Sequence, residues 1–125
     1  MTTTATDVEA IRGVLDGYMD AARSGLEADF RRDVFREDAT ICGYVGEELF
    51  SAPIGAFYEW NNENGPAKDV TGETVGVDVA GTIATARMEI YNWTGHRFTD
   101  MFTLLKSDGQ WRVVSKVFYM HPEGS

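Results

Sequence analysis

Two carboxylates, Glu89 and Asp100, are the residues of this sequence best suited by type and spacing to acid–base chemistry. They lie on consecutive predicted strands that are joined by the turn Thr94-Gly95. If this turn is a two-residue loop, Glu89 lies directly opposite Asp100, and Arg87 lies two residues away on the same face. Facing carboxylates repel each other, and a partly apolar pocket raises the pKa of one of them toward neutrality. We therefore predict Asp100 as a general base, Glu89 as its partner and Arg87 as the charge that tunes both.

The same residues also fit an alternative without catalysis. In that interpretation an Arg87–Glu89–Asp100 network of ion pairs only shapes the sheet. His96 adjoins a turn, where it is either an acid or base at the rim of the fold or an exposed turn residue, and we favour the exposed residue. His121 lies in the last few residues of the chain and is interpreted as a surface residue.

Aromatic residues would supply the walls of a pocket and a hydrogen-bond donor. Tyr18 or Tyr91 could donate a hydrogen bond to a carbonyl oxygen on which negative charge develops. A small, flat, apolar ligand would pack against neighbouring rings, although the same residues also fit ordinary core packing. The predicted ligand-binding residues are Phe57, Trp60, Tyr91, Phe98, Phe102 and Tyr119.

Three long strands in succession must position these side chains. Residues 82–93, 96–107 and 111–121 are rich in β-branched and aromatic residues, and Asp108-Gly109 is a second hairpin turn. Because side chains alternate, a one-residue slip would exchange the faces of a strand. One face is predicted to carry Arg87, Glu89, Tyr91, Phe98, Asp100, Phe102, Ser115, Val117 and Tyr119. The other is predicted to carry Ala84, Ala86, Met88, Ile90, Thr99, Met101, Thr103, Val114, Lys116 and Phe118.

Helices precede these strands. A capping box at residues 6–9 opens the first predicted helix, a second covers 27–35, and Ser51-Ala52-Pro53 is predicted to start a third. Further strands are predicted at 38–44 and 71–79. This order predicts an α+β fold in which helices pack on one side of a curved antiparallel sheet.

Composition limits the class of protein. The 125 residues suit one domain, 1–125, with an ordered core of about 7–120. The net charge of −9 disfavours nucleic acid and anionic membranes as partners, and no apolar run is long enough to span a membrane. The single cysteine, Cys42, fits a small buried side chain and a reducing, cytoplasmic location. No spacing typical of metal ligands or of a nucleotide cofactor occurs, so we expect a mechanism without a metal or cofactor.

Five short segments carry a resemblance to a known family: residues 38–39, 96–100, 104–106, 108–111 and 114–118. With them, the chain from about Val8 to Tyr119 resembles the nuclear transport factor 2 superfamily of conical α+β barrels. More narrowly, it is similar to the branch called putative lumazine-binding or polyketide-cyclase-like (SnoaL-like). The resemblance implies a sheet wrapped around the first helix, a pocket at the mouth of the cone, and a homodimer through the outer face of the sheet. By this analogy Arg87, Glu89, Asp100 and Phe102 point inward, and Met88, Ile90, Met101, Val114 and Phe118 form the dimer surface.

Two functions are consistent with these observations. The first is a cofactor-free isomerase, dehydratase or cyclase that acts on a small apolar carbonyl compound, with Asp100 and Glu89 as the acid–base pair. The second is a non-catalytic ligand-binding or dimeric assembly module. An open cavity with exposed carboxylates favours the enzyme, whereas a cone filled by Trp60 and Phe102 favours the module.

Overall fold

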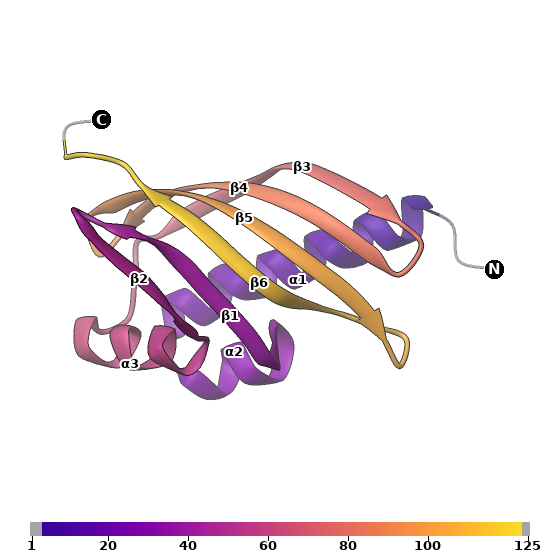
Figure 1. Ribbon diagram of the computed structural model, residues 1–125, viewed down its shortest axis with the longest axis horizontal. Coiled ribbons are helices and arrows are strands. Elements are labelled where there is room, and N and C mark those ends of the chain that lie inside the picture. The colour runs from indigo at the N-terminus through magenta and orange to yellow at the C-terminus, as the bar shows by residue number, and fades with distance from the viewer. Residues whose placement is uncertain (1–3, 124–125) are drawn as a thin grey trace.

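Within residues 4–123, which the computed structural model describes, six strands form one curved sheet and three helices cover its inner face (Figure 1). The long first helix runs beneath the sheet, and the two shorter helices lie under one end of it (Figure 1). The elements are α1 (Thr4–Ser24), α2 (Glu27–Asp33), β1 (Phe35–Val45), β2 (Glu48–Pro53), α3 (Gly55–Asn64), β3 (Thr71–Ala80), β4 (Ile83–Trp93), β5 (His96–Ser107) and β6 (Gln110–Met120).

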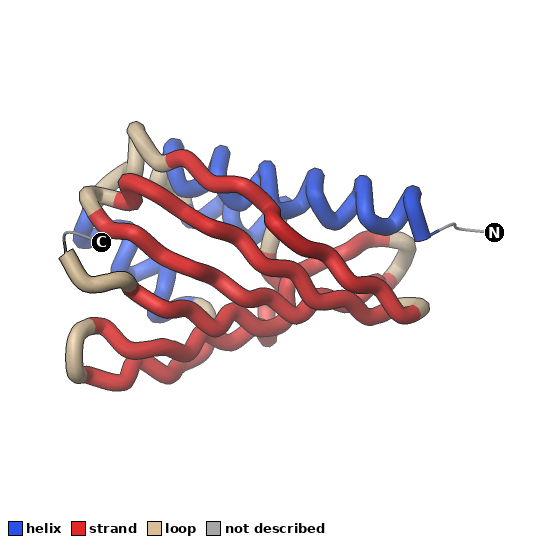
Figure 2. Tube along the Cα trace, turned by 90° about the horizontal axis from the view of Figure 1, so that it is seen from above, coloured by secondary structure: helices blue, strands red, loops and turns tan. Residues whose placement is uncertain are grey.

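The sheet has the strand order β2-β1-β6-β5-β4-β3 and is open rather than closed into a barrel (Figure 2). All neighbouring strands are antiparallel except β1 and β6, which pair in parallel. The predicted α+β class is confirmed, but the sheet is mixed instead of wholly antiparallel. The reason is that β1 and β6 are not joined by a hairpin: the chain passes through four other strands before β6 returns beside β1 in the same direction.

Helix α1 packs an apolar stripe against the sheet. It begins at Thr4, so the predicted capping box at residues 6–9 lies inside the helix instead of opening it. Asp7 of that segment accepts hydrogen bonds from Trp111 Nε1 and Lys106 Nζ, each at 3.1 Å, and thereby ties α1 to the β5–β6 hairpin. The buried stripe has helical spacing and consists of Ile11, Leu15, Tyr18, Met19 and Ala22.

The segment Ser51-Ala52-Pro53 belongs to a strand, and the prediction that it starts the third helix is wrong. It ends β2, which pairs with β1 so that Ser51 lies opposite Cys42. β2 is the edge strand of the sheet, where a proline with no backbone N–H is tolerated. Helix α3 starts only at Gly55.

A β-bulge in β4 changes the partner of Asp100. The turn Thr94-Gly95 is a two-residue loop, as predicted, but β4 has an extra residue just before it, where Asn92 has a φ of 61°. Asp100 therefore faces Met88, and Glu89 is displaced by one position.

A second bulge has the same effect in β6. The turn Asp108-Gly109 is again a two-residue loop, and β6 carries an extra residue at Val114. Asp100 therefore faces Phe118 rather than the predicted Val117.

Together the two bulges exchange the predicted faces of β4 and β6, whereas those of β5 are as predicted. Each bulge inserts one residue. Counted away from the turn, this extra residue moves every side chain beyond it to the opposite face of the sheet. The side chains predicted inward that lie on the outer face are Arg87, Glu89, Tyr91, Ser115, Val117 and Tyr119. The side chains predicted outward that lie on the inner face are Ala84, Ala86, Met88, Ile90, Lys116 and Phe118.

Candidate functional site

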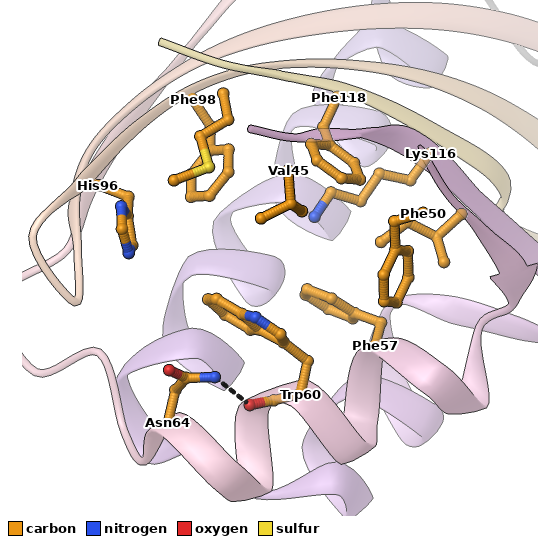
Figure 3. Close-up of a pocket in the computed structure, with 11 residues that line it drawn as sticks. Val45, Phe50, Phe57, Trp60, Asn64, His96, Phe98, Lys116 and Phe118 are labelled. Carbon is orange, nitrogen blue, oxygen red and sulfur yellow. Dashed lines mark hydrogen bonds between the residues drawn. The ribbon is translucent and has the colours of Figure 1, made fainter. Parts of the chain in front are cut away.

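A pocket of about 150 Å³ opens between α3 and the inner face of the sheet (Figure 3). The rings of Phe57 and Trp60 project from one side of α3, and Phe98 and Phe118 face them from the sheet (Figure 3). Such a pocket favours a small, mostly apolar ligand. Its walls are formed by Ile41, Val45, Phe50, Phe57, Trp60, Asn64, His96, Phe98, Lys116, Phe118 and Met120.

Lys116 is the one charged side chain among these pocket residues. It extends from β6 with its amine directed toward the rings on α3 (Figure 3), and only 5% of the residue is exposed. Its Nζ lies 4.0 Å from the centroid of the Phe57 ring and 5.3 Å from that of Tyr18. The pocket therefore presents a single amine on an aromatic wall.

Asp100 and Tyr18 lie behind this amine, on the side away from the pocket. The Nζ atom of Lys116 is 3.5 Å from Oδ2 of Asp100, and the Tyr18 hydroxyl donates a hydrogen bond of 2.9 Å to the same oxygen. Asp100 is 1% exposed, and its other oxygen, Oδ1, has no hydrogen-bond partner within residues 4–123. The three residues form a buried polar cluster in an otherwise apolar core.

Burial shifts all three groups toward their uncharged forms. It raises the pKa of Asp100, although the nearby Lys116 opposes this shift. It lowers the pKa of Lys116 against the opposing effect of Asp100, and it raises the pKa of Tyr18 well above its usual range. Burial thus opposes the charged forms of the amine and the carboxyl, while their closeness to each other favours those charged forms.

Of the four predicted catalytic residues, the structure brings Tyr18 and Asp100 together and leaves Glu89 and Arg87 elsewhere. Glu89 lies on the outer face in ion pairs with Arg87 at 2.8 Å and Arg97 at 2.9 Å. Partial burial raises the pKa of Glu89, but hydrogen bonds from Thr99, Arg87 and Arg97 outweigh it and lower the pKa to about 2. Glu89 is thus ionised, and the predicted pairing of Glu89 directly opposite Asp100 is wrong because of the bulge in β4. Its charge nevertheless contributes to the raised pKa of Asp100, after the larger effect of burial.

The predicted ligand-binding residues divide into three groups. Phe57, Trp60 and Phe98 line the pocket. Phe102 is buried in the core, with its ring edge-on to that of Tyr18 at 5.3 Å. Tyr91 and Tyr119 are 42% and 57% exposed on the outer face, so their predicted inward orientation is wrong.

Two pocket residues were assigned other places by the sequence. His96, interpreted as a surface residue, lies at the pocket, whereas His121 lies on the outer side with its Nε2 2.9 Å from the Thr99 hydroxyl. Lys116 was predicted on the outer face. The sequence holds one signal of its position, because a lone lysine lies in a mostly apolar strand segment between Val113 and Phe118. Strict alternation of side chains, counted from the turn Asp108-Gly109, nevertheless places Lys116 on the wrong face, because it ignores the extra residue at Val114.

Within residues 4–123, no cluster of three or more His, Cys, Asp or Glu side chains is arranged to hold a metal ion. In the same part of the chain, no helix is long and apolar enough to cross a membrane.

Comparison with known proteins gives consistent matches over nearly the whole chain. Residues 6–119 match the family model described as "Putative lumazine-binding". An NTF2-like protein of unknown function from Methylobacillus flagellatus has 46% sequence identity and a TM-score of 0.91, with 97% of each chain covered. Another from Shewanella baltica has 33% identity and a TM-score of 0.90, covering 98% of this chain and 100% of that one. Among curated proteins, the aldolase FrzH from Cladobotryum sp. is 23% identical over 120 residues, which is 95% of each chain.

Proposed function

We propose a function from the premise that the chain belongs to the putative lumazine-binding family of NTF2-like proteins. In this proposal the pocket binds a small apolar carbonyl compound and catalyses proton transfer beside the carbonyl group. Isomerisation, dehydration, cyclisation and aldol addition of carbonyl compounds each have a route that begins with the loss of such a proton. The relative from Cladobotryum is named an aldolase, which supports a reaction in this class. The proposed reaction uses no metal or cofactor.

The observation that carries this proposal is the position of Lys116 between the aromatic pocket and Asp100. As an ammonium, Lys116 stabilises the negative oxygen of an enolate, and as a free amine it accepts the proton that the ligand loses. Asp100 does not line the pocket, so its role is to exchange a proton with Lys116, and Tyr18 holds the carboxyl in place through its hydrogen bond.

The volume of the pocket limits the size of the ligand. A cavity of about 150 Å³ accommodates a molecule of roughly the size of one benzene ring. The rings of Phe57, Trp60 and Phe98 favour a flat molecule, and His96 or Asn64 can accept or donate a hydrogen bond to a polar substituent.

An alternative is a non-catalytic binding or assembly module. It is favoured by the absence of any carboxylate from the described pocket wall. Under either function we propose a homodimer through the outer face of β4–β6, because exposed apolar side chains lie along this face, with Met101 directly opposite Val117, and pairing would remove them from water. These side chains are Ile83, Tyr91, Met101, Val117 and Tyr119, which are 42–57% exposed.

Proton exchange in D2O tests the catalytic proposal without knowledge of the natural substrate. Acetophenone and phenylacetaldehyde each combine one ring with exchangeable protons beside a carbonyl, and ¹H NMR follows the replacement of these protons by deuterium. We expect the protein to accelerate the exchange, and Lys116→Met to return it to the rate in buffer. Lys68→Met is the matched control, because Lys68 is exposed and does not line the pocket. If neither compound exchanges faster with the protein, catalysis is refuted in favour of the module.

A further inference from the structure

We propose that Lys116 is a covalent site, at which its amine forms an imine with an aldehyde or ketone bound in the pocket. This inference rests on the proposed carbonyl-binding function and assigns that function a covalent step. It identifies the ligand class as carbonyl compounds with an accessible carbonyl carbon.

The first argument is the surroundings of the amine. A lysine on the surface is held as a hydrated ammonium, which has no lone pair and cannot attack a carbonyl carbon. The Nζ atom of Lys116 is enclosed instead by the rings of Phe57, Tyr18, Trp93 and Phe118, with centroids at 4.0–5.5 Å. Ring faces attract a cation, but burial is the larger effect and lowers the pKa of Lys116.

The second argument is access. Although 5% exposed, Lys116 forms part of the pocket wall, so the amine is shielded from bulk water but open to a ligand in the pocket (Figure 3). The ring of Trp60 lies farther along α3 than that of Phe57, which already contacts the amine, and it would hold a flat ligand beside the amine.

The third argument is the proton acceptor behind the amine. Asp100 Oδ2 lies 3.5 Å from Nζ and is hydrogen-bonded to Tyr18. Transfer of one proton from the ammonium to this carboxylate gives a free amine and a carboxylic acid. Both products are uncharged, so burial makes this transfer easier than it is in water.

These groups account for every atom and proton of imine formation. The nitrogen lone pair forms a bond to the carbonyl carbon, and a proton passes from nitrogen to the carbonyl oxygen to give a carbinolamine. The acid proton held by Asp100 passes to the nitrogen, and the nitrogen passes one of its protons to the hydroxyl. The carbon–oxygen bond then breaks and water leaves. The product is a protonated imine beside the Asp100 carboxylate, and no oxidant or reductant is consumed.

Reductive trapping of benzaldehyde tests the inference on the unmodified protein. Sodium cyanoborohydride reduces an imine to a stable amine, so each reacted lysine gains one benzyl group that intact-mass measurement and peptide mapping detect. The chain has three lysines, and the other two serve as internal controls: Lys68 is exposed, and Lys106 is paired with Asp7 at 3.1 Å. We expect Lys116 to react several times faster than Lys68 at pH 7, because the lowered pKa of Lys116 leaves more of its amine unprotonated.

A second measurement separates this inference from the function on which it rests. Benzyl alcohol has the same ring but no carbonyl, and its binding can be followed by the fluorescence of Trp60 at the pocket. Binding of benzyl alcohol without faster labelling of Lys116 overturns the covalent site and leaves the pocket proposal intact. Failure of benzyl alcohol to bind, together with equal labelling of all lysines, overturns both.

Variants test the role of the carboxyl. Asp100→Asn retains an acceptor for Tyr18 but loses the acid proton, and we expect it to slow labelling of Lys116 while labelling of Lys68 is unchanged. Tyr18→Phe is the second variant: it preserves the ring and is expected to slow labelling less, because Asp100 remains. Unchanged labelling of Lys116 in Asp100→Asn overturns the proton transfer.

Discussion

Replacement of Lys116 and Asp100, singly and together, measures the energetic coupling at the centre of the site. Both side chains are almost inaccessible, at 6% and 1% exposed, and their charged atoms are 3.5 Å apart. Lys116→Met leaves a buried carboxyl without its cation, and Asp100→Asn leaves a buried amine without its acceptor. Both charges are absent from the double variant Lys116→Met/Asp100→Asn, and Tyr18 retains an acceptor in the Asn side chain.

The expected size of the effect follows from this burial. Removing one partner of a buried pair costs about 3 kcal/mol or more, whereas replacing both by uncharged residues is often close to neutral. For a domain of 125 residues, a change of 1 kcal/mol shifts the melting temperature by roughly 4 °C. Each single variant should therefore melt roughly 12 °C lower. The double variant should be destabilised by at least about 2 kcal/mol less than the sum of the single costs.

Thermal and urea unfolding at pH 7, followed by circular dichroism, give the four stabilities of this cycle. Arg36→Met is the control, because Arg36 pairs with Asp38 at 2.9 Å on the surface, and its melting temperature should be unchanged. Single costs that add within about 0.5 kcal/mol would refute the reasoning, because uncoupled sites add in this way. The exchange of a proton between the two groups would then have no energetic basis.

Three further predictions concern other parts of the molecule. Gly43→Ala would place a Cβ 2.5 Å from the Phe118 carbonyl oxygen and 2.7 Å from its ring, so urea unfolding should show a loss of about 1–3 kcal/mol. Gly13→Ala has open space on the exposed face of α1 and should gain stability. Glu89→Gln should lower the melting temperature above pH 4.5, where the native carboxylate is ionised and paired. The difference in melting temperature between the wild type and this variant should disappear as the pH falls to about 2, and a difference that stays constant with pH would contradict the prediction. Val117→Lys puts a charge on the exposed outer face and should shift light-scattering mass from dimer to monomer, whereas a wild-type monomer would refute the interface.

The predicted fold class and both hairpin turns followed from local signals. Asp108-Gly109 and Thr94-Gly95 are turn sequences whose geometry depends on the residues themselves, and both form two-residue loops. The strand β2 was missed because Pro53 suits both the first turn of a helix and the end of an edge strand. Only pairing with β1, which is a tertiary contact, decides between these.

The site was predicted in part for a similar reason. Asp100 and Tyr18 were selected by chemistry, and β5 has the predicted orientation, so the two meet as a hydrogen-bonded pair. Glu89 and Lys116 were placed on the wrong faces, because alternation was continued through Asn92 and Val114. A bulge at either residue depends on how the whole sheet bends, and no local residue pattern marks it.

Because of the bulges at Asn92 and Val114, the number of residues between two positions of a strand no longer decides whether their side chains lie on the same face. In β6, Val113 and Lys116 both point inward although they are three positions apart. Without the extra residue Val114 they would be two positions apart, which is the spacing of side chains on one face of a strand. Deletion of Val114 would restore even spacing and leave Lys116 inside, but the strand would lose the bend that a bulge provides. Loss of this one residue would therefore change the curvature of β6 while the same amine remained on the inner face of the sheet.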